Sequence, residues 1–156
     1  MEKRVTLTGT YSHRESRHVS SNWAQICADH EEEFPEIRAC HPGTFNVVLA
    51  NSYRPPDDDA LRQKARARGL SVRRYVDGNH VSPTAKVVEI NGKPVDAWIY
   101  RGGHGGRPVV ELLSRLALAD YLRLSDGSSV SLIIVEHPES QEGMPGMPPT
   151  SPGRSV

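Results

Sequence analysis

Short apolar segments separated by turn-forming residues run through most of this chain, and they constrain its fold more than any other feature. In Val5–Tyr11 apolar residues alternate with Thr and Gly, and in Phe45–Leu49 Phe, Val and Leu take every second position. Because successive side chains of a strand point to opposite faces, this alternation indicates strands with one buried face. Further strands are predicted at Ala85–Ile90, Val95–Tyr100 and Val130–Val135.

Turn signals separate these segments. Asn91-Gly92 stands between two predicted strands, and this dipeptide strongly favours a tight hairpin because both residues tolerate positive φ angles. Pro42-Gly43 precedes the strand that begins near Phe45. The apolar run Val109–Leu118 is typical of a packed strand or a packed helix, which periodicity alone does not distinguish.

Two segments favour short helices. Trp23, Ile26 and Cys27 recur at helical spacing behind a serine-rich capping signal, which predicts a helix over 22–30. The charged segment Asp58–Gly69 predicts a surface helix ended by its glycine. Many short strands with only two short helices indicate a mostly β fold, a small closed β-barrel.

The chain length suits one domain. At 156 residues, folding buries roughly 70% of the surface that the unfolded chain exposes, enough for a single core. From residue 138 onward Pro, Gly, Ser and Met dominate, and such a segment buries too little apolar surface to offset its ordering entropy. We therefore predict a barrel domain over 1–137 and a disordered tail over 138–156.

Charge and cysteine content narrow the function classes. Lys plus Arg equals Asp plus Glu at 19 each, so the net charge is zero. The protein as a whole therefore exerts no long-range electrostatic attraction on nucleic acid, which argues against a nucleic-acid partner. The basic run Arg62–Arg68 follows Asp57–Asp59, so it favours a solvated helix face, with a phosphate-attracting surface as the alternative. Cys27 and Cys40 form no metal-binding pattern and suit a reducing compartment.

Localisation is predicted from two further absences in the sequence. No apolar run approaches the roughly 20 residues that cross a bilayer, and no charged-then-apolar start directs secretion. We expect a cytoplasmic protein with no membrane partner.

Two blocks of the sequence resemble one enzyme family. The segment Pro42–Leu49 is similar to the P-G-T-L-N-V-x-L motif of the CTP-dependent riboflavin kinases of archaea. Val109–Ser114, and the segments from there to Ile134, are similar in order and spacing to that family's V-V-E-I-I-A-P and L-x-D-G-x-x-V-x-I-x-I blocks. The resemblance covers about residues 4–136 and identifies the chain as a divergent member.

This resemblance implies both a fold and a reaction. The fold is a cradle-loop β-barrel. The reaction transfers the γ-phosphoryl group of CTP to the 5′-hydroxyl of riboflavin, giving FMN and CDP, and it needs Mg²⁺. Riboflavin or FMN and CTP or CDP are therefore the expected small-molecule partners.

Three residues carry the implied chemistry. The family's magnesium-binding Thr and Asn fall on Thr44 and Asn46, and oxygen ligands of this kind suit a hard cation that also binds phosphates. The family's flavin-contacting Glu falls on Glu111, which would orient or activate the acceptor hydroxyl. From the residues alone, Thr44 and Asn46 could instead satisfy a turn, and Glu111 could be exposed.

The remaining predicted site residues lie where the chain departs from the family. Gly103 stands at the position of a flavin-contacting Thr, so His104 is the nearest polar substitute for substrate binding. The family's glycine-rich phosphate loop becomes Ser12–His18, which contains no glycine, so phosphate binding would need side chains such as His13, Arg14, Arg17 or His18. The other predicted nucleotide-binding residues are Gly43, Arg115, Leu116, Ala117 and Leu118.

These departures support two alternatives to a kinase. A non-catalytic barrel could bind a flavin or a nucleotide as a sensor or carrier, which the glycine-free loop and the absent Thr favour. An interaction module could instead dock a protein partner through the tail from Pro138 onward.

Overall fold

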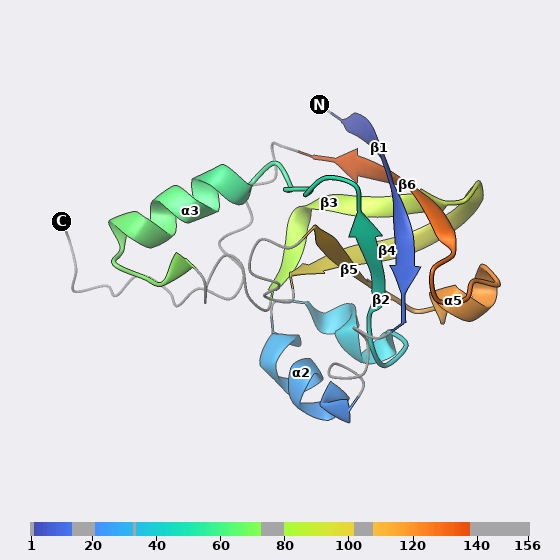
Figure 1. The fold of residues 1–156 in the computed structure, drawn as a ribbon. Helices are drawn as coiled ribbons and strands as arrows, with labels where there is room; N and C mark the ends of the chain where they lie inside the picture. Colours follow the sequence, from blue (N-terminus) through green and yellow to red (C-terminus); the bar gives the residue numbers. More distant parts are fainter. Residues whose placement is uncertain (1, 14–20, 33, 73–79, 102–107, 138–156) are drawn as a thin grey trace.

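Six antiparallel strands close into a barrel in the computed structural model, which describes residues 2–13, 21–32, 34–72, 80–101 and 108–137 (Figure 1). The strands are β1 (Lys3–Ser12), β2 (Phe45–Leu49), β3 (His80–Ile90), β4 (Lys93–Arg101), β5 (Val109–Ser114) and β6 (Ser129–Glu136). Their order around the barrel is β1-β2-β5-β4-β3-β6. The predicted mostly β fold with a closed barrel is confirmed. The predicted tail over 138–156 lies outside the described residues.

The pairing of the first and last strands closes the barrel, and a tight hairpin joins two of the strands between them. The first and last strands pair along nearly their whole length, from Lys3 opposite Glu136 to Thr10 opposite Ser129. The predicted hairpin joins β3 to β4, and Asn91 and Gly92 have φ angles of 51° and 79°. Positive φ at both central residues is what a two-residue hairpin turn requires.

The barrel interior is filled by the alternate residues that the sequence pattern predicts. Phe45, Val47 and Leu49 of β2 are all buried in one hydrophobic cluster. Val110 and Leu112 of β5 join the same cluster from the neighbouring strand. Asn46 and Glu111, which lie between these residues in sequence, therefore project from the outer side of the barrel wall.

Both predicted helices are present, and the described residues also form two further short helical segments, a 3₁₀ helix and one turn of α-helix. They are α2 (Trp23–His30), the 3₁₀ helix η2 (Pro35–Ala39), α3 (Asp58–Ala67) and α5 (Leu118–Tyr121). The apolar run that begins at Val109 is thus a strand that ends at Ser114, followed by α5. None of the described helices has the length and apolar character needed to span a membrane.

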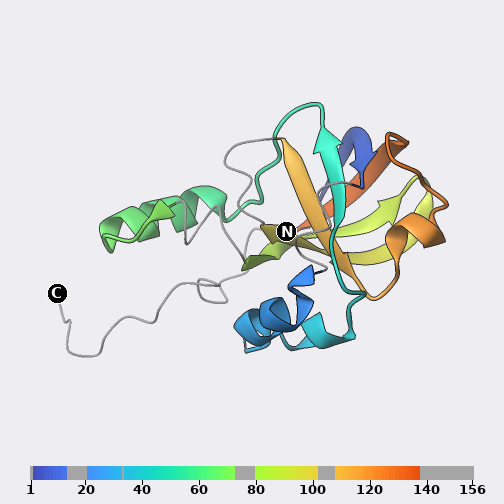
Figure 2. The same ribbon diagram turned by 60° about the horizontal axis from the view of Figure 1, so that its bottom comes forward.

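The segment that holds α2 and η2 covers the outer face of β4 and β5 (Figure 2). Cys27 of α2 and Ile37 of η2 belong to a second buried cluster with Tyr100 of β4 and Leu113 of β5. Strand β5 and the Trp98–Tyr100 end of β4 are therefore covered on both faces. Burial of β5 on both faces explains why Val109–Leu113 is apolar apart from Glu111 and shows little alternation.

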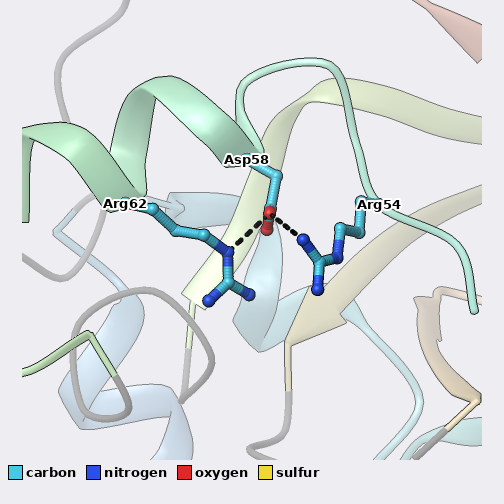
Figure 3. A network of polar contacts seen from close by, with 3 residues as sticks. All are labelled: Arg54, Asp58 and Arg62. Atoms are coloured by element: carbon cyan, nitrogen blue, oxygen red, sulfur yellow. Dashed lines mark hydrogen bonds and ion pairs between the residues drawn. The ribbon is translucent and has the colours of Figure 1, made fainter. Parts of the chain in front are cut away.

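Polar contacts hold the start of α3, which extends away from the barrel in Figure 1. Asp58 is buried, and its carboxylate lies 2.8 Å from Arg62 Nε and 3.8 Å from an Arg54 guanidinium nitrogen (Figure 3). Thr84 of β3 donates a 2.7 Å hydrogen bond to Asp57. The acidic residues ahead of the basic run therefore balance its charge and also attach the start of α3 to β3.

Candidate functional site

A row of buried polar side chains crosses three neighbouring strands on the outer side of the barrel wall. Asn46 of β2 is opposite Glu111 of β5, and Glu111 is opposite Tyr100 of β4. Their exposed fractions are 0%, 3% and 3%. His30 of α2 packs edge-on against Tyr100, with ring centres 5.5 Å apart. The interpretation of Glu111 as an exposed residue is therefore wrong.

Thr44 joins this row from the turn that precedes β2. Its hydroxyl donates a 3.2 Å hydrogen bond to Glu111 Oε1. Gly43 has a φ angle of 114°, a conformation that other residues rarely adopt, and it sets the path of the chain into Thr44. Within the described residues the Thr44 hydroxyl thus bonds to a distant strand, and no bond from it to the Pro42-Gly43 turn is seen.

The side-chain amide of Asn46 is buried, and among the described residues it makes no hydrogen bond that would stabilise the fold. Neither Oδ1 nor Nδ2 of Asn46 has a hydrogen-bond partner in the described part of the chain. A buried polar group left unpaired costs about 1–3 kcal/mol, and such groups are rare in native proteins. An unpaired, fully buried amide beside a carboxylate is a reason to look for a ligand at this position.

A cavity of about 220 Å³ adjoins Thr44 at one end of the barrel. One wall is largely apolar and is built by residues 116–119, which include the predicted Leu116, Ala117 and Leu118. The predicted Gly43 and Thr44 also line the cavity. The structure thus brings five of the predicted site residues to one cavity, and Thr44 connects that cavity to Glu111.

Other predicted site residues lie elsewhere. The guanidinium carbon of Arg115 is 5.9 Å from the centre of the Trp98 ring, and Arg115 is not among the residues that line the cavity. Arg14, Arg17, Gly103 and His104 lie outside the described residues.

The cavity lining also includes polar residues from β1, from β5 and from two loops. Tyr11, His13, His41 and Ser114 belong to it. Tyr11 stacks on Phe45 with ring centres 4.7 Å apart. Burial raises the pKa of the Tyr11 phenol, and the nearby carboxylates of Asp126 and Asp120 add to the effect.

Sequence reasoning pointed to His13 but missed Tyr11 and Asp120. Tyr11 reads as the last apolar residue of a strand pattern, and Asp120 as one polar residue in a leucine-rich segment. Neither position carries a local signal, because the cavity is assembled from four separate parts of the chain.

The described residues suit a magnesium ion held by few protein oxygens, and they do not form a metal site made entirely of protein side chains. Within the described residues there is no group of three or more His, Cys, Asp or Glu side chains that could hold a metal. Mg²⁺ usually keeps several waters and takes few protein oxygens together with substrate phosphates. The Thr44 hydroxyl and the unpaired Asn46 amide are two such oxygens next to a carboxylate.

The two blocks of sequence that resemble the riboflavin kinases form adjacent strands. Asn46 from the first block is opposite Glu111 from the second. Comparison of the sequence with models of known protein families and with curated proteins gives no match. The family resemblance therefore rests on these residues.

Proposed function

We propose that this chain is a riboflavin kinase-like phosphotransferase that transfers the γ-phosphoryl group of CTP to the 5′-hydroxyl of riboflavin. The observation that carries the proposal is the meeting of Thr44, Asn46 and Glu111 on one buried face. These residues come from two strands far apart in sequence, and Thr44 hydrogen-bonds to Glu111 at 3.2 Å. The family resemblance links the same three positions to one reaction.

Thr44 and Asn46 would hold Mg²⁺, which when bound neutralises charge on the nucleotide phosphates. A hydroxyl that donates its proton to Glu111 keeps its lone pairs for a cation, so both contacts of Thr44 are compatible. Asn46 would gain through its amide oxygen the partner that it lacks among the described residues.

Glu111 would orient the acceptor hydroxyl and accept its proton. The carboxylate is buried and held by Thr44, so its position is set before a substrate arrives. A general base must lie within hydrogen-bonding reach of the proton that it removes. Thr44 lies between Glu111 and the cavity, so this role requires the acceptor hydroxyl to take the place of the Thr44 hydroxyl at the carboxylate.

The cavity is suited to one end of a nucleotide. Leu116, Ala117 and Ala119 offer apolar surface to a base or a sugar, whereas other residues of the lining offer hydroxyl and imidazole groups. Binding sites for small molecules commonly combine an apolar lining with a few polar groups. This division supports a ligand that has an apolar ring and a charged group.

Mass spectrometry of the protein incubated with riboflavin, Mg²⁺ and either CTP or ATP tests the proposal. We expect FMN from the wild type and at least a hundredfold less from Thr44→Ala, Asn46→Ala and Glu111→Gln. Thr8→Ala and Asn51→Ala are matched controls, because both side chains are exposed, and they should keep full activity. FMN formation that survives Thr44→Ala and Asn46→Ala would contradict the assigned roles, and no product with either donor would contradict the kinase.

Binding without transfer is the second candidate function. It is favoured because Asn46 and Glu111 do not line the cavity, so only Thr44 of the three residues adjoins it. Calorimetric binding of riboflavin or CTP by a wild-type protein that forms no FMN would support a sensor or carrier.

A further inference from the structure

Two histidines from distant parts of the chain border the cavity next to Thr44. They are His13, directly after β1, and His41, directly before the Pro42-Gly43 turn. Among the described residues that line the cavity, they are the only side chains able to carry positive charge, and Asp120 is the only carboxylate. The charge of the cavity lining therefore depends on these two imidazoles and on Asp120.

His13 is held in place by contacts to both its backbone and its ring. Its backbone N–H donates a 2.8 Å hydrogen bond to Asp126 Oδ1, which ties the end of β1 to the turn before β6. The Tyr11 hydroxyl lies 3.2 Å from Nδ1 of His13, within hydrogen-bonding distance. Because Tyr11 is itself stacked on Phe45, these contacts fix the imidazole relative to the barrel wall.

His41 is held by a backbone contact to a different strand. Its backbone N–H donates a 2.8 Å hydrogen bond to the carbonyl of Ser114, the last residue of β5. Ser114 also lines the cavity and is buried. The residue after β1 and the loop before β2, which is held against the end of β5, thus contribute one histidine each to the lining of the same cavity.

We infer that His13 and His41 bind the oligophosphate of a nucleotide through their imidazole side chains. A cradle of backbone amides usually needs glycines so that the amides converge without obstruction, and the segment Ser12–His18 contains none. Imidazole can donate a hydrogen bond to phosphate and can carry a charge near neutral pH. The identity of the anion as a nucleoside triphosphate rests on the proposed function.

Calorimetric titration with inorganic tripolyphosphate tests anion binding separately from catalysis. The titrated proteins are the wild type, His13→Gln, His41→Gln and the double variant. The control is His137→Gln, an exposed histidine beyond the far end of β6. We expect each single substitution to raise the Kd about tenfold, the loss of one hydrogen bond to a charged group, and the double variant to raise it further. His137→Gln should leave the Kd unchanged.

Each result supports or overturns the inference. Unchanged tripolyphosphate affinity in the double variant, or no binding by the wild type, would overturn it. If His13→Gln does not unfold cooperatively, the His41→Gln result decides, because the contact that fixes His41 uses its backbone.

The proposed function and this inference fail in different ways. An unchanged KM for CTP in a double variant that still makes FMN would overturn the role of the histidines and leave the kinase standing. Loss of tripolyphosphate binding in the double variant, with no FMN formed by the wild type, would support the histidines and contradict the kinase.

Discussion

Asn46→Leu separates the demands of the fold from the demands of a ligand. Leucine carries two methyl groups where asparagine carries Oδ1 and Nδ2, so the branching of the side chain is kept. Asn46 is 0% exposed, and both polar atoms lack a hydrogen-bond partner among the described residues. If Asn46 is kept for Mg²⁺ and nucleotide, its replacement should stabilise the unliganded protein and remove the response to ligand.

The magnitude follows from the unpaired amide. A buried polar group without a partner costs about 1–3 kcal/mol, and an apolar group of the same shape avoids that cost. The free energy of unfolding should therefore rise by about 1–3 kcal/mol in Asn46→Leu. For a domain of this size each kcal/mol moves Tm by about 2–4 °C, so Tm should rise by about 2–12 °C. Asn46→Ala should gain less, because it leaves a cavity.

Urea unfolding without ligand gives the free energy, and thermal unfolding with and without Mg²⁺ and CTP gives the ligand response. The wild type should gain Tm with ligand, and Asn46→Leu should not. Asn51→Leu, on an exposed loop, is the matched control and should stay within about 0.5 kcal/mol of the wild type. An Asn46→Leu protein less stable than the wild type by more than about 1 kcal/mol would refute the reasoning, since the amide would then be hydrogen-bonded in the folded protein.

Three further substitutions test other parts of the structure. Thr44→Val removes the hydrogen bond to Glu111 and should lower the free energy of unfolding in urea by about 1.5–3 kcal/mol; an unchanged value would contradict that bond. Gly9→Ala would place a Cβ atom 2.2 Å from the Val48 carbonyl oxygen and should cost at least about 1–3 kcal/mol in the same assay, whereas a neutral effect would contradict this close approach. Burial raises the pKa of the Cys40 thiol to about 11, so the neutral thiol is favoured in the folded protein. The contribution of the neutral Cys40 thiol to the free energy of unfolding is complete below about pH 8.5, the pKa of a free thiol. This contribution is lost as pH rises toward 11. Urea unfolding at pH 8 and pH 10.5 should therefore show a smaller loss of stability for Cys40→Ala than for the wild type, and equal losses would count against the raised pKa.

Local patterns predicted the strands well because alternation and turn chemistry are properties of neighbouring residues. Phe45, Val47 and Leu49 face the core as their spacing indicates, and Asn91-Gly92 forms the expected hairpin. The run from Val109 was ambiguous, because a strand buried on both faces lacks the alternation that would distinguish it from a buried helix. Only its pairing with β2 and β4 identifies it as a strand.

The sequence by itself determined which chemical groups stand at Thr44, Asn46 and Glu111, and alternation in β2 already placed Asn46 opposite the core residues. The tertiary structure alone decided that these groups meet. The register of β2 against β5 brings Thr44 close to Glu111, although the two residues are 67 positions apart in the sequence. No local sequence pattern encodes a contact between such distant residues. The structure also decided that the outer side of the wall is buried. Part of that burial comes from α2 and η2, and cover by remote segments leaves no trace in the periodicity of the strands they cover.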